Sequence, residues 1–274
     1  MRPFALICLV LTMSVATTNA EDRHPMMSTN WWATAGVFRA DRDFEASASA
    51  RFGGGSREFD LEGILGLDDS TDLFMSELGW QFAQNWGLAL QYFRSSRSGS
   101  RVLEETFEWQ DTVFDVGARL DARTELQISR FFFARRFRNE AGAHSLRIGA
   151  GVHWLSFDAE VSGEARINDT TTEFRRQKAS AEFPFPNIGA WYRYSPNRYW
   201  LFNVRLDWLS ASIENYSGDI WNIAAGVNYR ASKHVGIGAS YQYFELAGGL
   251  TEPNWRGDIE MSLSGPYLYI NAFW

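Results

Sequence analysis

The last ten residues, from Gly265 to Trp274, alternate between two kinds of side chain. Apolar side chains occupy every second position: Leu268, Ile270, Ala272 and Trp274. Aromatic or polar side chains fill the places between them: Tyr267, Tyr269, Asn271 and Phe273. Because successive side chains of a β-strand point to opposite faces, this period of two predicts a closing strand with one purely apolar face.

The first twenty residues have the pattern of a secretory signal peptide. Arg2 supplies the positive start, and an apolar stretch follows from Phe4 to Val15. Small residues at 18–20 then suit cleavage before Glu21. A membrane-spanning helix needs about 20 apolar residues, so this stretch is too short for an anchor. We predict a signal peptide at residues 1–20 and an exported domain at residues 21–274.

Composition narrows the class of the exported domain. Without residues 1–20 the chain has 25 basic and 33 acidic residues, a net charge of −8, which argues against nucleic acid as a partner. The only cysteine, Cys8, lies in the signal peptide, so the exported domain has no disulfide. Aromatic residues make up 16% of the chain, yet no exported stretch is apolar enough for a spanning helix. A membrane protein of this kind must be a closed barrel, because lipid permits no unpaired sheet edge.

Segments with a period of two recur along the whole exported domain, and we count ten. They predict an all-β, transmembrane, antiparallel up-and-down β-barrel, with eight strands as the alternative. The predicted strands are residues 32–52, 72–83, 86–97, 112–137, 144–157, 183–194, 199–213, 220–229, 235–246 and 259–274. Within 112–137, the run from Phe131 to Phe133 breaks the alternation, so Arg130 could point to either face.

The predicted connections alternate in length. Short turns at 84–85, 138–143, 195–198 and 231–233 alternate with long polar connections at 53–71, 98–111, 158–182 and 247–258. Short periplasmic turns and longer outer loops are the pattern of barrels in the bacterial outer membrane. This sorting predicts a protein of the Gram-negative outer membrane, surrounded by its lipid, with both termini in the periplasm.

The strand at 199–213 assigns faces most clearly. Trp200, Phe202, Val204, Leu206 and Trp208 share the face expected to contact lipid, and Trp32 and other tryptophans near strand ends are expected at the membrane interface. Polar residues on the opposite faces predict a lumen filled by a charge network: Glu77, Arg147, His153, Arg193, Arg205, Asp207 and Arg230. A barrel of ten strands is narrow, so these charges must be paired.

The aromatic-terminated last strand resembles the closing strand of bacterial outer-membrane barrels. The resemblance rests on Leu268, Ile270, Ala272 and the terminal Trp274. It implies that the barrel-assembly machinery recognises this strand during biogenesis, which makes that machinery an expected partner.

A second resemblance comes from the first long connection. Phe59-Asp60-Leu61-Glu62 followed by Leu65-Gly66-Leu67-Asp68-Asp69 is similar to a motif in a group of small, mostly uncharacterised outer-membrane barrels of proteobacteria. This resemblance implies a barrel with a packed first loop and implies no substrate. The alternative is a solvated acidic turn. The ligand spacing of an EF-hand is absent here, so we expect no metal site.

Three classes of function remain open at this stage. The first is a structural or surface-interaction barrel whose surface ligand the sequence does not identify. The second is a narrow porin-like pore, which its arginines would make selective for small anionic solutes. The third is a barrel-embedded hydrolase or lipid-modifying enzyme resting on His153 and Asp207. We expect the first class, with neither enzymatic activity nor a cofactor.

Overall fold

The computed structural model describes residues 23–50, 57–59, 70–103, 107–109, 112–167, 171–213, 216–252 and 255–274. The predicted signal peptide, residues 1–20, lies outside the described residues. The first-loop motif begins at Phe59, which is described at the end of a short strand, and the rest of the motif, from Asp60 to Asp69, also lies outside the described residues. No helix among the described residues is long and apolar enough to cross a membrane.

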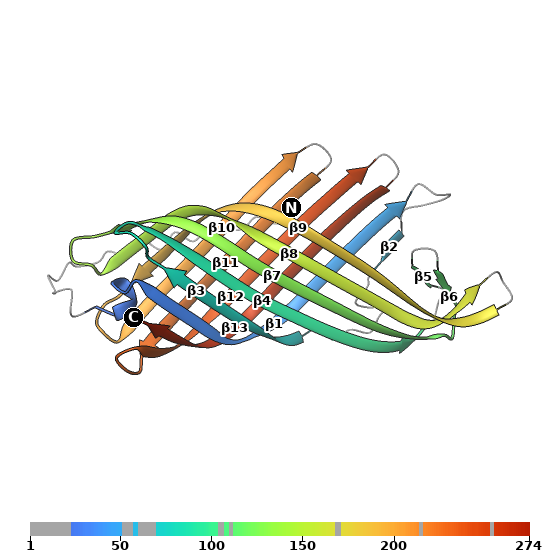
Figure 1. Ribbon diagram of the computed structural model, residues 1–274, viewed down its shortest axis with the longest axis horizontal. Helices are drawn as coiled ribbons and strands as arrows, with labels where there is room; N and C mark the ends of the chain where they lie inside the picture. The colour runs from blue at the N-terminus through green and yellow to red at the C-terminus, as the bar shows by residue number, and fades with distance from the viewer. Residues whose placement is uncertain are drawn as a thin grey trace, which may run out of the picture.

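Ten long strands form the wall of a closed barrel (Figure 1). They are β1 (Trp31–Ala50), β3 (Ser70–Trp80), β4 (Trp86–Val102), β7 (Arg119–Arg138), β8 (His144–Ile167), β9 (Thr171–Tyr194), β10 (Trp200–Ile213), β11 (Tyr216–Arg230), β12 (Val235–Glu252) and β13 (Trp255–Phe273). Three short strands lie off the wall: β2 (Arg57–Phe59), β5 (Phe107–Trp109) and β6 (Thr112–Phe114). The long strands pair antiparallel in sequence order, and β1 closes the ring against β13. The prediction of an all-β, ten-stranded antiparallel barrel is confirmed, and the eight-strand alternative is wrong.

One end of the barrel carries the short connections, and we call it the turn end. Residues 81–85, 139–143, 195–199 and 231–234 join the strand pairs there. Trp31 and Trp274 exchange backbone hydrogen bonds at this end, so the first long strand and the last residue lie together. We call the opposite end, where the other connections lie, the extended end.

The predicted long connections at 158–182 and 247–258 need correction. Strand β8 continues to Ile167 and β9 already begins at Thr171, while β12 continues to Glu252 and β13 begins at Trp255. Only residues 168–170 and 253–254 remain between the paired strands. The outward apolar alternation stops where a strand leaves lipid, but backbone pairing continues in water, so the sequence pattern ended before the strands did.

Strand β7 shows this change of environment within one element. Toward the extended end its inward side chains are buried and mostly apolar, including Leu126 and Ile128, and its outward ones include Arg123 and Glu125. From Arg130 to the turn end the polarity reverses: Arg130 and Arg136 are buried inside, whereas Phe131, Phe133 and Phe137 are exposed outside. The run from Phe131 to Phe133 is therefore regular, with Phe132 pointing into the lumen.

Two apolar clusters fill the lumen at different heights. The larger occupies the extended half and includes Phe38, Leu126, Leu155, Phe244 and Leu263. The smaller lies at the turn end and consists of Met26, Met27, Trp32, Ala89, Phe132, Ala134, Trp191, Leu201 and Phe273. The charged residues Glu77, Arg130, Arg205 and Asp207 lie between these clusters.

Exposed aromatic residues form two rings on the outer surface. One ring lies near the turn end and includes Trp80, Trp86, Trp200 and Trp274. The second lies partway along the strands, where Trp208 faces Trp221 across β10 and β11. Such rings mark the two membrane interfaces. The expectation for Trp32 is wrong, because its side chain points into the lumen and is 2% exposed.

Candidate functional site in the lumen

The centre of the lumen is held by a buried ion pair between two strands that are not neighbours in the sheet. Arg130 on β7 lies 2.8 Å from Asp207 Oδ1 on β10, and both side chains are almost wholly buried. Asn222 Nδ2 donates to the other carboxylate oxygen at 3.1 Å. Arg130 also lies over the rings of Phe132, at 4.2 Å, and Trp191, at 4.8 Å. The guanidinium is thus positioned by one carboxylate and two aromatic faces.

A glycine makes room for this carboxylate. Gly189 on β9 is paired directly with Asp207 on β10. A Cβ atom at Gly189 would lie 2.1 Å from Asp207 Oδ1, closer than real Cβ atoms come. The sequence therefore supplies both the buried acid and the gap in the neighbouring strand that accommodates it.

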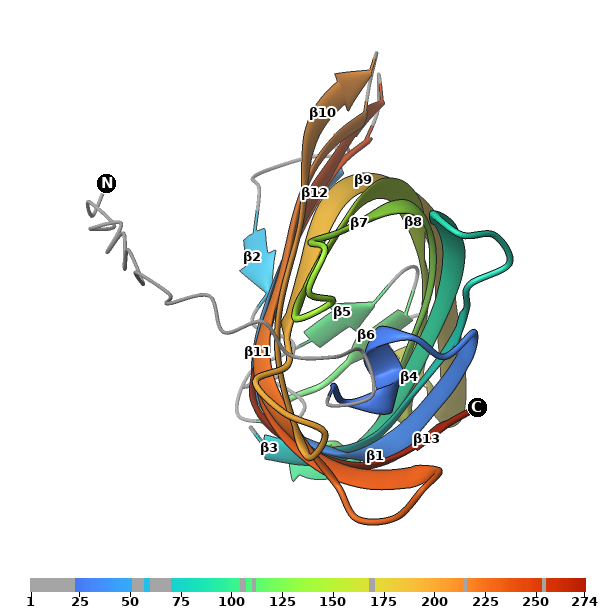
Figure 2. The ribbon, with the colours of Figure 1, turned by 90° about the vertical axis from the view of Figure 1, so that its left-hand side faces the viewer.

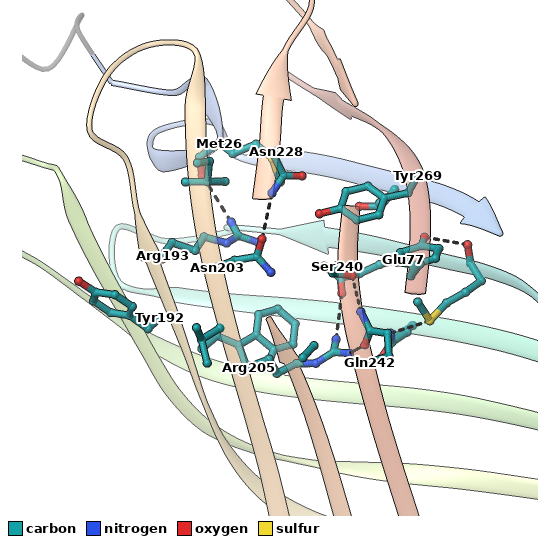
Figure 3. Close-up of a pocket in the computed structure, with 18 residues that line it drawn as sticks. Met26, Glu77, Tyr192, Arg193, Asn203, Arg205, Asn228, Ser240, Gln242 and Tyr269 are labelled. Atoms are coloured by element: carbon teal, nitrogen blue, oxygen red, sulfur yellow. Dashed lines mark hydrogen bonds and ion pairs between the residues drawn. The ribbon is translucent and has the colours of Figure 1, made fainter. Parts of the chain in front are cut away.

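A second ion pair lies beside the first (Figure 3). Arg205 NH1 lies 3.3 Å from Glu77 Oε2, and its NH2 donates to Gln242 Oε1 at 3.1 Å. Glu77 Oε1 accepts the indole N–H of Trp32 at 2.9 Å. Arg205 Nε is also 4.0 Å from Asp207 Oδ2. Together with Trp32, Gln242 and Asn222, the two acids and two arginines form one continuous network across β1, β3, β7, β10, β11 and β12.

His153 joins this network only through an amide. Its Nε2 lies 3.4 Å from Asn222 Nδ2, the same amide nitrogen that donates to Asp207. The imidazole is 1% exposed and packs against Phe244 with ring centroids 5.9 Å apart. His153 and Asp207 therefore form no direct pair of the kind that a hydrolase uses. Among the described residues, no three His, Cys, Asp or Glu side chains gather in a way that could hold a metal.

The remaining predicted lumen residues divide between two places. Arg147 and Arg193 point into the lumen near the turn end, where their guanidinium groups lie 4.7 and 4.8 Å from the ring of Trp32. Arg147 NH2 donates to Gln81 Oε1 at 3.3 Å. Arg230 does not join the network: its Nε donates to the carbonyl oxygen of Ser232 in the adjacent turn. Arg230 is the last residue of β11, at the turn end of the lumen.

Residues before the first strand fill the turn end of the lumen (Figure 2). They form one turn of 3₁₀-helix, η2 (Pro25–Met27), and Met26 and Met27 are buried. Arg23 anchors the segment by donating to the carbonyl oxygens of Ser195 and Pro196 at 3.0 and 2.9 Å. The His24 N–H donates to Ser195 Oγ at 2.8 Å. We call residues 23–29 the N-terminal plug.

A cavity of about 80 Å³ separates the plug from the charge network. Met26 lines its turn-end side, Glu77, Arg193 and Arg205 supply its charges, and Tyr269 lies on another wall (Figure 3). This volume holds a few water molecules. A second cavity of about 20 Å³ lies beside His153 and Arg130, and has room for one.

Sequence reasoning missed Arg130, Arg136 and the plug. Arg130 and Arg136 lie on even positions of β7 with the buried Phe132 and Ala134, so the parity of the strand could have assigned them once the reversal of polarity was allowed for. The plug carries no periodic pattern. Its contacts are long-range, and only the closed barrel brings them together.

The predicted assembly residues lie on the outer face of β13, except for Trp274, which directly follows this strand. Leu268, Ile270 and Trp274 are exposed, and Ala272 is partly buried. The alternate residues Tyr267, Asn271 and Phe273 are buried in the lumen. The last strand thus has the two faces that its alternation predicts.

The barrel is similar to solved structures of bacterial outer-membrane proteins. The outer-membrane protease OmpT of Escherichia coli is similar at a TM-score of 0.54 and 8% identity, over 94% of this chain and 99% of that one. The outer membrane protein OprG of Pseudomonas aeruginosa matches over the same shares, at a TM-score of 0.39 and 10% identity. No family model and no curated protein matches the chain. The fold is that of bacterial outer-membrane β-barrels.

Membership of this fold class indicates where the barrel lies, in the outer membrane, but does not indicate its activity. An outward apolar band and two aromatic rings belong to a protein of the outer membrane. At 8% identity the likeness to a protease concerns the fold alone. The resemblance of the first loop to a group of proteobacterial barrels stays a prediction.

Proposed function

We propose that this protein is a closed outer-membrane barrel with a structural or surface-interaction role. One observation carries the proposal: the salt-bridged centre of the lumen is enclosed between two apolar clusters. A permeant ion would have to displace buried side chains such as Phe244 and Leu263 on one side and Met26 on the other. A permanently open path is not the state that this packing favours.

The extended strands support a role at the surface. Strand β8 has 24 residues, whereas a tilted strand crosses the membrane with about 9–11. The part beyond the lipid has a mostly apolar interior, and ion pairs join its outward faces, among them Arg94–Glu125 and Lys178–Glu160. Figure 1 shows the strand groups β4, β7–β9 and β10–β13 diverging there. Strands that continue beyond the lipid in this way can present a binding surface to a partner.

The proposed orientation places the extended end outside the cell and the turn end, with both termini, in the periplasm. A polar hollow of about 420 Å³ on the extended parts of β4, β7 and β8 is one surface available to a partner. Ser98, Asp121, Arg123 and Glu160 contribute to its lining. Labelling of a cysteine introduced at Ser100 in intact cells tests the orientation, and labelling only after the outer membrane is permeabilised would contradict it.

Conductance tests the closed barrel. The full chain, refolded and inserted into a planar lipid bilayer, should give no stable single-channel steps at moderate voltage. Clear steps in the wild-type protein would overturn the proposal. A variant lacking residues 21–29 serves as a comparison, because it removes the plug and leaves the extended-half cluster in place.

The runner-up is a narrow pore for small anions, favoured by one observation. The cavity beside the plug is lined by Arg193 and Arg205, and only Glu77 among its lining residues is acidic. In that function the plug and part of the extended-half cluster would have to move. Single-channel conductance steps of the wild-type protein that select chloride over potassium would favour the pore if Arg205→Gln reduced this selectivity.

We further propose that the barrel is not an enzyme. His153 is wholly enclosed and meets Asp207 only through Asn222, so a substrate carbonyl could not reach the pair without unpacking the lumen. If the barrel did hydrolyse esters, peptides or lipids through this histidine, His153→Gln would abolish the activity of the purified protein. Such a histidine-dependent activity would refute this part of the proposal.

A further inference from the structure

Three arginines lie side by side on the lumen face at the turn end. Arg136 on β7 is paired directly with Arg147 on β8, and Arg193 on β9 faces Ser145, two residues from Arg147. Each side chain is 5–6% exposed. Like charges directly opposite on neighbouring strands repel one another, and burial strengthens the repulsion. We call Arg136, Arg147 and Arg193 the arginine triad.

The described part of the chain supplies no carboxylate within ion-pair distance of the triad. The two lumen acids lie at the next level, where Asp207 binds Arg130 and Glu77 binds Arg205 and the indole of Trp32. The charge of Glu77 does act on Arg147 and Arg193 from a distance. Arg147 and Arg193 thus share the partial influence of one acid that already has its own partners, while the charges acting on Arg136 are those of Arg138 and Arg193.

Several N–H groups of the triad are left over. Arg136 uses NH2 on the carbonyl oxygen of Gln84, at 2.8 Å, while its Nε and NH1 have no partner. Arg147 uses NH2 on Gln81, while its NH1 has none. Arg193 NH1 reaches the carbonyl oxygen of Met26 at 3.5 Å. Buried guanidinium donors normally find acceptors, so these atoms indicate a missing acceptor.

We propose that the arginine triad binds a phosphate-type oxyanion in the lumen at the turn end. An oxyanion supplies the missing charge and the missing acceptors together, and its paired oxygens match the forked donors of guanidinium better than a halide does. The plug covers the site, since Arg193 and Arg138 donate to the carbonyl oxygens of Met26 and Met27. The anion therefore enters from the turn end, past the plug or before the plug docks.

Thermal unfolding of the full-length mature protein in zwitterionic micelles tests the site. The transition is followed by heat-modifiable gel migration, with inorganic phosphate replacing chloride at constant ionic strength. The midpoint is expected to rise steadily with phosphate, because a ligand of the folded state stabilises it by mass action. Arg147→Gln should lose this response while unfolding at or above the wild-type midpoint in chloride, because one repulsive charge is gone.

Arg135→Gln is the matched control. It removes one charge from the neighbouring strand β7, where Arg135 is paired with Ile148 at nearly the same height, but its side chain faces outward against Trp86 and Phe137. Its phosphate response should equal that of the wild type. A flat wild-type midpoint, or equal responses in Arg147→Gln and Arg135→Gln, would overturn the proposal.

A direct binding measurement keeps the proposal testable if the triad variants do not fold. Equilibrium dialysis of the wild-type protein against radiolabelled phosphate should give about one bound anion per barrel. An excess of vesicles containing phosphatidylglycerol tests whether a lipid phosphate occupies the site instead, since it would then displace the label. Binding far below one per barrel without such vesicles would contradict the site.

Discussion

Arg130 and Asp207 connect β7 with β10, which β8 and β9 separate in the barrel wall, and they lie 2.8 Å apart although they are 77 residues apart in sequence. Each is the other's closest charged partner, and both side chains are almost wholly buried. The pair lies where β7 changes from an apolar to a polar interior. It therefore marks the level at which the water-exposed and membrane-embedded parts of the barrel meet.

Removing either partner of this pair should destabilise the barrel strongly. Arg130→Met leaves a wholly buried carboxylate with one amide and the distant Arg205, and losing one partner of a buried pair costs about 3–5 kcal/mol. The free energy of unfolding in urea, measured in lipid vesicles by tryptophan fluorescence, reports the loss. The double variant Arg130→Met/Asp207→Leu should be less destabilised than either single variant, because no buried charge remains.

Arg94→Met is the control for that experiment. Arg94 pairs with Glu125 at 2.6 Å on the outer surface beyond the lipid, where water screens the interaction. We expect a change close to the error of the measurement. If Arg130→Met were no worse than Arg94→Met, the central pair would not stabilise the fold.

Charge on the lipid face of β10 should be poorly tolerated. Val204 is 49% exposed on the outward face, between Phe202 and Leu206. Val204→Arg places a charge in lipid, at a cost of about 2–4 kcal/mol near the midplane. Ser96→Arg, also outward but beyond the lipid on β4, should cost little. Equal folding yields and unfolding free energies for the two variants would show that inside and outside are wrongly assigned.

Arg205→Ala probes the opposite face of the same strand. It deprives Glu77 and Gln242 of their guanidinium partner, and a buried pair broken on one side costs on the order of 3–5 kcal/mol, less where lumen water reaches the carboxylate. The same unfolding assay measures the effect. Tolerance of Arg205→Ala would mean that the cavity water fully replaces the guanidinium.

Docking of the N-terminal plug should weaken in acid. Burial, reinforced by Arg193 and Arg230, lowers the pKa of His24 from 6.5 to about 4. The undocked segment therefore binds a proton first as pH falls below about 6.5. The stabilisation is complete above that pH and is lost progressively down to about pH 4, about 3 kcal/mol in all.

Hydrogen exchange measures this docking. The Met27 amide, which donates to the His24 carbonyl oxygen, should exchange faster as pH falls from 6.5 to 4, after correction for the intrinsic rate. His24→Gln keeps an acceptor for the Met26 amide without a titrating ring, so its exchange should depend far less on pH. Equal pH dependence in both proteins would assign the effect to another group.

The last two residues should have separable roles. Phe273 is wholly buried in the turn-end cluster, so Phe273→Ala should cost about 3–5 kcal/mol of stability in purified protein. Trp274 is 54% exposed on the outer face, so Trp274→Ser should leave refolding in vitro nearly unchanged and lower the yield of folded barrel in cells. Normal yield of Trp274→Ser in cells would remove the terminal residue from the assembly signal.

The sequence alone determined the features that depend on period and local environment. The alternation of Trp200 to Trp208 assigned the faces of β10, and ten such segments gave the strand number, because lipid on one side imposes a strict period of two. The same reasoning placed Glu77, Arg147, Arg193, Arg205 and Asp207 in the lumen. Each of these residues could be assigned to the lumen face from the alternation along its own strand.

Only the tertiary structure decided which side chains from different strands contact one another in the lumen. The partner of Asp207 is Arg130, which lies on a strand whose polarity reverses midway. Because of this reversal, the sequence pattern did not assign Arg130 to either face of the strand. The like-charged neighbours Arg136 and Arg147 are opposed only because of the register of β7 and β8. The plug follows no period, since its shape is set by the space that the closed barrel leaves. Periodicity reports the environment of one strand, and contacts across a lumen exist only after the ring has closed.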